Sequence, residues 1–165
     1  GLVSGAGISD FGHQVVCADI AAEKIEQLKK GAIPIYEPGL EELFHQNVIT
    51  GRLIFSTSLK DAMKKSNIFL IEVGTPESPN GAANMEYVYN VAKEIGINLV
   101  RESVIVNKST VSVGTADKVS AIIKKELDLR VKDIPFHVVS NPEFLKEGDA
   151  IHRHSDCGGG ANNGR

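Results

Sequence analysis

The sequence predicts an α/β fold with a doubly wound parallel sheet, and two observations support this. Short apolar runs alternate with amphipathic stretches along most of the chain, as in a parallel sheet with helices on both faces. Acid, hydroxyl and glycine residues follow several of the apolar runs. Open parallel sheets bind their ligands at the carboxyl ends of the strands, so these residues are the candidates for a site.

Composition limits the classes of protein to which the chain can belong. Its 165 residues fit one domain, and a content of 42% hydrophobic residues supplies an ordinary core. A formal net charge of −3 offers no basic field for nucleic acid or for an anionic membrane. No apolar run approaches the roughly 20 residues that span a bilayer. The cysteines are Cys17 and Cys157, so we expect no disulfide framework and a reducing, cytoplasmic compartment.

The first half of the chain is expected to hold five elements. Gly12 follows a helix rich in small residues and Gly31 follows an amphipathic one, as left-handed C-caps do. Ile25 and Leu28 form the inward face of the second helix, and Pro38 suits the first turn of a third. In order, we expect a helix at 2–11, a buried strand at the short apolar run 14–20, helices at 21–30 and 39–50, and a strand at 53–56.

Six further elements alternate in the second half. Ser58, with Asp61 one turn later, suits the start of one helix, and Asn84 suits the start of the next. The run NIFLIEV is strongly apolar and predicts a strand. In order, we expect a helix at 58–65, a strand at 67–73, a helix at 85–99, a strand at 103–107, a helix at 114–127 and a strand at 136–139. The tail at 152–165 is rich in glycine and asparagine without apolar periodicity, and is expected to be disordered.

Asp19 closes the first expected strand and is the main candidate for binding a cofactor. An acid at this point of a dinucleotide-binding fold accepts hydrogen bonds from the adenosine ribose, and it repels a 2′-phosphate, which favours NAD over NADP. Lys24 lies one helical turn further and can reach the same nucleotide. The structural alternatives are a helix N-cap for Asp19 and a solvated surface lysine for Lys24, and the residues alone leave them open.

Three glycines near the start invite comparison with a phosphate-binding loop. Gly1, Gly5 and Gly7 have the spacing G-x-x-x-G-x-G rather than G-x-G-x-x-G, and no strand precedes them. Tight helix packing is the preferred interpretation for Gly5 and Gly7. Gly1 differs because it lies about 20 residues before Asp19, the separation expected between the last part of a glycine loop and the acid.

Two later strands end in polar turns. Gly74 follows the first of them directly, with Thr75 and Pro76 beside it, and a glycine there would let a cofactor approach the backbone. The alternative is a plain turn. Ser109 and Thr110 follow the next strand, and two hydroxyls there suit a polar ligand, with an ordinary helix cap as the alternative.

The last expected strand leads to a pair of carboxylates. Glu143 and Glu147 share a side if this stretch is helical, so one can serve as general acid or base and the other can place cofactor or substrate. The alternative is a solvated helix start. His152, His154 and Cys157 lie in the glycine-rich tail without a rigid frame or a fourth ligand, so no metal site is expected.

The order of these motifs resembles the UDP-glucose/GDP-mannose dehydrogenase family over residues 1–151. The matching words are GLVSGA, CADI, IPIYEPGLEEL, GRLIFST, VGTP, KSTV, VGTADKV and SNPEFLKEGDAI. Within the family, IPIYEPGLEEL followed by GRLIFST looks most like UDP-glucose 6-dehydrogenases. The alternatives are dehydrogenases of GDP-mannose or UDP-N-acetylmannosamine, or a non-catalytic nucleotide-binding module.

The resemblance implies a cytoplasmic, homo-oligomeric oxidoreductase with NAD as its cofactor and UDP-glucose as its substrate. The C6 alcohol of the sugar is oxidised in two steps to the carboxylate of UDP-glucuronate. A cysteine of a second domain holds the intermediate as a thiohemiacetal and then as a thioester.

The resemblance also implies roles for residues at the matching positions. Gly1 corresponds to the last glycine of the pyrophosphate loop, and Asp19 and Lys24 to residues on the adenosine ribose side of NAD. Thr110 would lie near the catalytic water, and Glu143 would be the general acid or base of thioester hydrolysis. The residues implied to line the cofactor are Val73, Gly74, Thr75, Pro76, Ser109, Thr110, Val111 and Glu147. Those implied to border the sugar nucleotide are Glu143, Phe144, Leu145, Lys146 and Glu147.

The chain also departs from the family pattern. The family's first strand, which is central in a Rossmann-like sheet, has no counterpart before Gly1, so the sheet is expected to lack it and to present two unpaired edges. We expect a partial NAD-binding domain at residues 1–151 and a foreign tail at 152–165, without the linking helix or the sugar-nucleotide-binding domain that carries the catalytic cysteine. Such a fragment is expected to be inactive alone.

Overall fold

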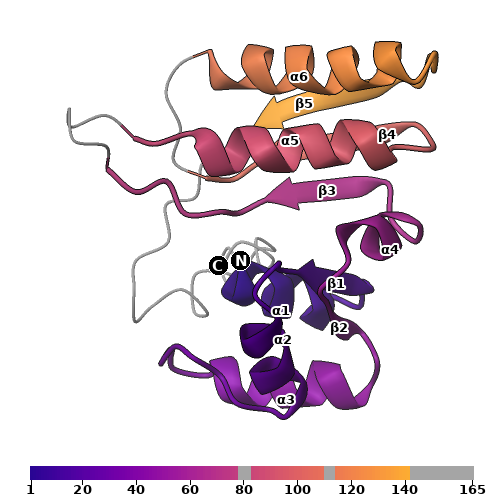
Figure 1. Cartoon of the computed structure of the whole chain (residues 1–165). Helices are drawn as coiled ribbons and strands as arrows, with labels where there is room; N and C mark the ends of the chain where they lie inside the picture. Colours follow the sequence, from indigo (N-terminus) through magenta and orange to yellow (C-terminus); the bar gives the residue numbers. More distant parts are fainter. Residues whose placement is uncertain (78–82, 110–113, 142–165) are drawn as a thin grey trace, which may run out of the picture. The chain divides into compact units, whose positions relative to one another are not determined.

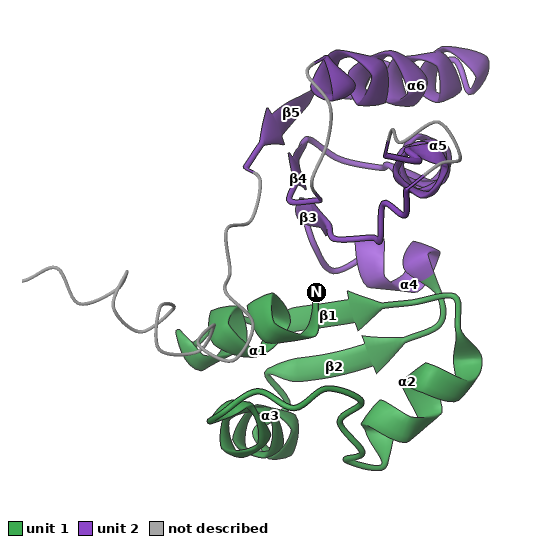
Figure 2. Cartoon of the chain, turned by 90° about the vertical axis from the view of Figure 1, so that its left-hand side faces the viewer, with its two compact units in different colours: residues 1–58, 144–165 green, residues 59–143 purple. Residues whose placement is uncertain are grey.

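The computed structural model describes residues 1–77, 83–109 and 114–141. These residues form two compact units, one within residues 1–58 and the other within residues 59–141 (Figure 2). Each unit combines helices with parallel strands, which confirms the predicted α/β fold. The predictions about the tail and about the boundary at residue 151 fall outside the described residues.

The first unit is a pair of parallel strands with three helices. Strands β1 (Val15–Ala18) and β2 (Leu53–Ser56) are paired in parallel. Its helices are α1 (Leu2–Asp10), α2 (Ala22–Lys29) and α3 (Leu40–Ile49). All five elements lie within about three residues of the predicted bounds, as expected for sequence-based boundaries. The Phe44 ring from α3 stacks on Phe55 from β2, with 5.4 Å between the ring centroids, at the centre of the core.

Gly5 brings α1 close to β1, as predicted from its position among small residues. A Cβ atom added at Gly5 would lie 2.6 Å from the Sγ atom of Cys17. Gly7 is also buried in the same helix. The tight-packing interpretation of Gly5 is therefore confirmed, since no larger side chain fits without displacing Cys17.

The second unit contains a three-stranded parallel sheet in the order β3-β4-β5. The strands are β3 (Ile68–Ile71), β4 (Ser103–Asn107) and β5 (Phe136–Ser140). The helices are α4 (Leu59–Met63), α5 (Glu86–Asn98) and α6 (Thr115–Leu129). Helices α5 and α6 run alongside each other and share one apolar cluster with Ile71 of β3 and Ile105 of β4 (Figure 1).

The prediction that the run at 14–20 forms a buried strand is wrong, because in β1 Val15, Val16 and Cys17 are only half-buried and Ala18 is exposed. Strand β3 is also open on one face: Ile68 is 58% exposed and Leu70 is 38% exposed, whereas Ile71 is 1% exposed and packs against the helices. Within the described part of the chain, β3 pairs only with β4 and β1 only with β2, so both are edge strands. The predicted unpaired edges are therefore present in this structure, and apolar side chains of β3 are left in solvent.

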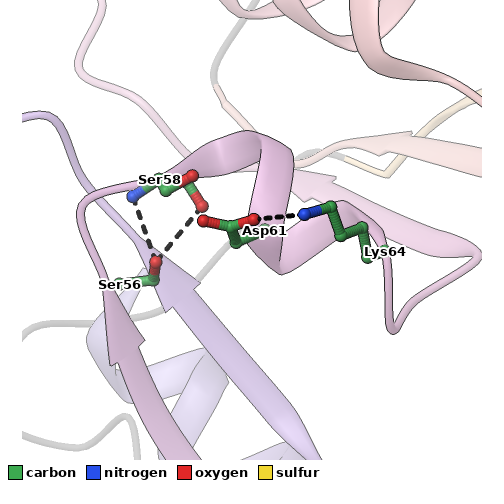
Figure 3. A network of polar contacts seen from close by, with 4 residues as sticks. All are labelled: Ser56, Ser58, Asp61 and Lys64. Atoms are coloured by element: carbon green, nitrogen blue, oxygen red, sulfur yellow. Dashed lines mark hydrogen bonds and ion pairs between the residues drawn. The ribbon is translucent and has the colours of Figure 1, made fainter.

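Short polar contacts follow β2 and occur within α4. The Oγ atom of Ser56 accepts the N–H of Ser58 at 3.0 Å and donates to its carbonyl oxygen at 3.2 Å (Figure 3). Asp61, in the first turn of α4, pairs with Lys64 at 2.7 Å. Since α4 begins at Leu59, Ser58 occupies the position before the helix that the sequence predicted for it.

Helices α5 and α6 approach closely at Gly96. A Cβ atom added at Gly96 would lie 2.7 Å from Cβ of Glu126 and 3.0 Å from the carbonyl oxygen of Ile123. Beside this contact, Nη1 of Arg130 donates to the carbonyl oxygens of Gly96 at 2.8 Å and Leu99 at 2.9 Å. The guanidinium thereby satisfies carbonyls that the C-terminus of α5 leaves without helical partners.

Three helices end in the same hydrogen-bonded turn, but one of them lacks glycine. Gly31 after α2 and Gly51 after α3 adopt positive φ, as a left-handed C-cap requires. At the end of α6 the same position is Val131, with φ of 52° and 91% exposure. The N–H of Lys132 still bonds the carbonyl oxygen of Leu127 at 3.0 Å, so the turn is complete despite the valine. A β-branched residue is strained in this conformation.

We expect Val131→Gly to raise the free energy of unfolding by about 1 kcal/mol, because it relieves this strain without removing buried surface. Chemical denaturation with urea measures the change. Gly51→Val is the reciprocal control and should lower stability, since it places the strained residue in an equivalent turn where an added Cβ meets no atom within 4 Å. A Val131→Gly protein no more stable than the wild type would contradict the strain argument.

Candidate functional site

Asp19 and Lys24 form an ion pair at the carboxyl end of β1. Oδ2 of Asp19 lies 2.6 Å from Nζ of Lys24, and Oδ1 accepts the N–H of Ala21 at 3.0 Å. The carboxylate thus accepts a backbone N–H just before α2, but the N-cap alternative for Asp19 is wrong, because Ala21 is the N-cap residue of this helix. Because the Asp19 side chain keeps 31% of its surface exposed, it remains within reach of a ligand.

The surroundings of Asp19 favour the charged carboxylate. Partial burial raises its pKa, but the hydrogen bonds from Lys24 and from the Ala21 N–H, together with the lysine charge, lower it further, and the net pKa lies below the usual value. Asp19 is thus ionised at neutral pH. A carboxylate in this state accepts hydrogen bonds and repels phosphate, which are the properties predicted for a group that binds ribose hydroxyls.

We expect Lys24→Met to raise the pKa of Asp19, because the substitution removes the hydrogen bond and the charge that lower it. A depressed carboxylate pKa stabilises the fold above the unfolded-state pKa of about 3.9, and this contribution is lost as pH falls through the folded-state value. In the Lys24→Met variant, Asp19 should contribute less to the free energy of unfolding, so less of this free energy should be lost as the pH falls. NMR titration of the Asp19 carboxyl measures the pKa directly. Lys29→Met removes a similar pair with Glu26 in the same helix and should leave Asp19 unchanged, so equal pKa values in all three proteins would contradict the prediction.

Gly1 lies at the N-terminus of α1, in the same unit as Asp19. It is the exposed N-cap residue of this helix, and its carbonyl oxygen accepts the N–H of Gly5 at 2.9 Å. The first turn of α1 carries no acidic side chain. A helix N-terminus of this kind attracts phosphate through its backbone N–H groups and its dipole.

Gly74 follows the carboxyl end of β3, and the backbone conformation there does not require a glycine. Its φ lies outside the positive range, and an added Cβ would meet no heavy atom within 4 Å. A type II turn would need a glycine with positive φ, as at Gly114, but a type I turn would not, so the φ of Gly74 does not decide between the plain turn and a cofactor contact. The following residues, Thr75 and Pro76, continue this segment, and the carbonyl oxygen of Pro76 accepts the N–H of Asn84 at 2.8 Å.

Ser109 contacts the same segment from the carboxyl end of β4. Its Oγ atom accepts the N–H of Val73 at 3.1 Å and lies 2.9 Å from the carbonyl oxygen of Val73. The side chain is 7% exposed. The structure therefore brings Ser109 together with Val73, two residues that the sequence placed on different strand ends.

Asn107, the last residue of β4, could not be singled out from the sequence motifs. It is fully buried, and among the described residues neither its amide nitrogen nor its amide oxygen has a hydrogen-bond partner. Burying an unpaired amide costs about 1–3 kcal/mol, so packing alone does not account for its presence at the strand end. The sequence SVIVN carries no signal for this, because apolar residues occupy both faces of the strand, and only the structure shows that Ser103, Ile105 and Asn107 share the buried face.

The remaining predicted site residues lie outside the described part of the chain. They are Thr110, Val111, Glu143, Phe144, Leu145, Lys146 and Glu147, and the same holds for His152, His154 and Cys157. Within residues 1–77, 83–109 and 114–141, no group of three histidine, cysteine or acidic residues is arranged to hold a metal ion. The described helices include none that is long and apolar enough to cross a bilayer.

Parallel strands joined by helices, with an ionised acid at the end of β1, define the class of dinucleotide-binding α/β domains. The sequence model for the UDP-glucose/GDP-mannose dehydrogenase family, NAD binding domain, matches residues 1–157. The chain belongs to this family, as predicted, and the match confirms NAD as the predicted cofactor.

Individual relatives agree with this assignment. The chain is 51% identical to the UDP-glucose 6-dehydrogenase TuaD of Bacillus subtilis, over 92% of this chain and 32% of the relative. It is 38% identical to the GDP-mannose 6-dehydrogenase of Pseudomonas putida, over 92% of this chain and 35% of that protein. A solved UDP-glucose dehydrogenase from Pyrobaculum islandicum superimposes with a TM-score of 0.85 at 37% identity, covering 92% of this chain and 35% of that one. The chain thus spans about a third of the length of these oxidoreductases.

Proposed function

We propose that the protein carrying this domain oxidises UDP-glucose to UDP-glucuronate and reduces NAD. The observation that carries the proposal is the ionised Asp19 carboxylate at the end of β1, held by Lys24 at 2.6 Å. In a dinucleotide-binding domain this acid accepts hydrogen bonds from both ribose hydroxyls of the adenosine. Lys24 keeps the carboxylate charged and contacts the same nucleotide, while NADP is disfavoured because its 2′-phosphate would face a negative charge.

Two further positions support binding of the rest of the cofactor. The exposed N-terminus of α1 at Gly1 suits the pyrophosphate. Open space above Gly74 suits close approach of the dinucleotide to the backbone of Val73, Gly74, Thr75 and Pro76. NAD accepts a hydride in each oxidation step, and the residues of this chain bind and orient it.

The roles of the residues outside the described ranges follow from family resemblance. In this proposal Thr110, Val111 and Glu147 contribute to the cofactor site, together with Ser109 from the described part of the chain. Glu143 acts as the general acid or base beside a water held near Thr110, and residues 143–147 border the sugar nucleotide. The protein is proposed to be a homo-oligomer, which follows from the family resemblance. It is also proposed to be cytoplasmic, since the sparse cysteines of this chain suit a reducing compartment.

The choice of UDP-glucose rests on the relatives. Identity to the UDP-glucose 6-dehydrogenase TuaD is 51%, against 38% for the GDP-mannose enzyme. The test offers the purified protein UDP-glucose, GDP-mannose and UDP-N-acetylmannosamine in parallel, each with NAD, and follows NADH. We expect the highest kcat/KM with UDP-glucose. Selective oxidation of another sugar nucleotide would overturn the substrate, and absence of turnover with all three would favour a non-catalytic module.

We expect Gly74→Ala to weaken NAD binding without lowering stability. The methyl group fills the space through which the cofactor approaches, whereas the backbone tolerates alanine and gains about 0.4–1 kcal/mol from reduced freedom of the unfolded chain. Isothermal titration calorimetry and urea unfolding measure the two effects separately. Unchanged NAD affinity would remove Gly74 from the cofactor site.

A further inference from the structure

Ser109 connects two segments that have left the sheet. The β3–β4 ladder ends where Ile71 lies opposite Asn107. Beyond it, the N–H groups of Lys108 and Ser109 both reach the carbonyl oxygen of Ile71, at 3.0 and 3.2 Å. The next bonds come from a side chain, because Oγ of Ser109 takes over the contact with Val73.

The hydroxyl of Ser109 bonds to the backbone both as an acceptor and as a donor. Its oxygen accepts the N–H of Val73 at 3.1 Å, and its one hydrogen can be donated to the carbonyl oxygen of Val73 at 2.9 Å or of Ile71 at 3.3 Å. Serine has a single O–H to donate, so a cofactor atom could take this hydrogen only by displacing a backbone carbonyl. At 7% exposure, the hydroxyl is also poorly placed to meet a ligand directly.

We propose that Ser109 is a positioning residue, a clamp that fixes Val73 and thereby sets the conformation of the cofactor-lining segment at residues 73–76. This inference rests on the proposed NAD-binding role of that segment. The N–H and carbonyl oxygen of Val73 are both bound to one side chain, so the peptide on each side of Val73 has a defined orientation. The backbone entering Gly74 is therefore held in place by Ser109. Gly74 itself has no such support, because even an added Cβ would meet no heavy atom within 4 Å.

The clamp makes a prediction that direct cofactor contact does not. In the protein without NAD, Ser109→Ala should speed hydrogen–deuterium exchange of the Val73 amide, because its acceptor is removed. The same variant should bind NAD about tenfold more weakly. The lost hydrogen bond contributes roughly 1 kcal/mol to holding Val73 in place, and NAD binding would have to supply that ordering instead. Mass spectrometry of a peptide containing Val73 gives the first readout, and calorimetry gives the second.

Ser103→Ala is the matched control. Ser103 is also buried on β4, at the other end of the strand, and its hydroxyl donates to the carbonyl oxygen of Arg101 at 2.9 Å. This variant should change neither Val73 exchange nor NAD affinity. Ser109→Thr retains the hydroxyl and should restore both towards wild type. If Ser109→Ala does not fold, Ser109→Cys keeps a weaker acceptor at the same place and is measured in the same way.

The two readouts together distinguish a clamp from direct contact between Ser109 and the cofactor. Weaker NAD binding with unchanged Val73 exchange would overturn the clamp in favour of direct contact. Faster exchange with unchanged NAD affinity would overturn its role in positioning the cofactor. A wild-type protein that binds no NAD would refute the proposed function, and the positioning role with it, whereas the exchange result would still show whether Ser109 holds Val73.

Discussion

Asp19→Lys is expected to weaken NAD binding by about two orders of magnitude or more. The substitution removes a charged acceptor for the ribose hydroxyls, and each hydrogen bond to a charged group contributes about 1.5–3 kcal/mol. It also puts a second cation beside Lys24, because Nζ of Lys24 lies 2.6 Å from the Asp19 carboxylate in the unsubstituted protein. The two bonds together correspond to a loss of about 3–6 kcal/mol, or roughly a hundredfold or more in Kd.

Calorimetry on the intact protein measures this loss. Glu26→Lys is the control, because Glu26 also pairs with a lysine on α2, at 3.1 Å, and the charge change is identical. Asp19→Asn distinguishes loss of the charge from disruption of the fold. It removes the negative charge, but its amide oxygen can still accept the N–H of Ala21. We expect Asn to fold normally and to bind NAD more weakly than wild type. Unchanged affinity in Asp19→Lys would remove Asp19 from the cofactor site.

Gly96→Ala is expected to lower the free energy of unfolding by about 2 kcal/mol, within the range of 1–3 kcal/mol typical of overpacking. The new methyl would lie 2.7 Å from Cβ of Glu126 and 3.0 Å from the carbonyl oxygen of Ile123. These atoms belong to the backbone or are bonded to it, so they move only if α5 and α6 separate. Separation would also strain the bonds from Arg130 to the carbonyl oxygens of Gly96 and Leu99.

Urea unfolding measures the effect, and a second substitution tests its cause. Glu126→Gly removes the nearest Cβ but leaves the carbonyl of Ile123, so the double variant Gly96→Ala/Glu126→Gly should recover no more than part of the loss. Gly74→Ala, where the added methyl meets no atom, is the neutral comparison. A Gly96→Ala protein as stable as wild type would show that the helices are not held at this distance.

Local features of the fold were predictable because they are encoded in adjacent residues. Gly12, Gly31 and the glycine-rich face of α1 follow from the backbone freedom and small size of glycine, and the structure confirms all three. The apolar run that forms β1 was misjudged for the opposite reason. The sequence shows that Val15 and Val16 are apolar, whereas their burial depends on whether another strand or helix covers them, and both are only half-buried.

The site was predictable only in part. An acid at the end of β1 can be recognised from sequence spacing, and Asp19 was identified in this way. The contact between Ser109 and Val73 could not be, because it joins residues 36 positions apart through a side chain and a turn. Asn107 was missed because a polar residue at the end of an apolar run looks like the start of a loop, while the structure buries it completely.

The central claim is that the carboxylate of Asp19 binds the adenosine ribose of NAD. A crystal structure of the intact protein with NAD bound tests it most directly. We predict Oδ1 or Oδ2 of Asp19 within about 2.5–3.0 Å of the ribose hydroxyl oxygens, with the pyrophosphate at the N-terminus of α1. A dinucleotide bound away from the carboxyl end of β1, with Asp19 in contact only with Lys24 and Ala21, would contradict it.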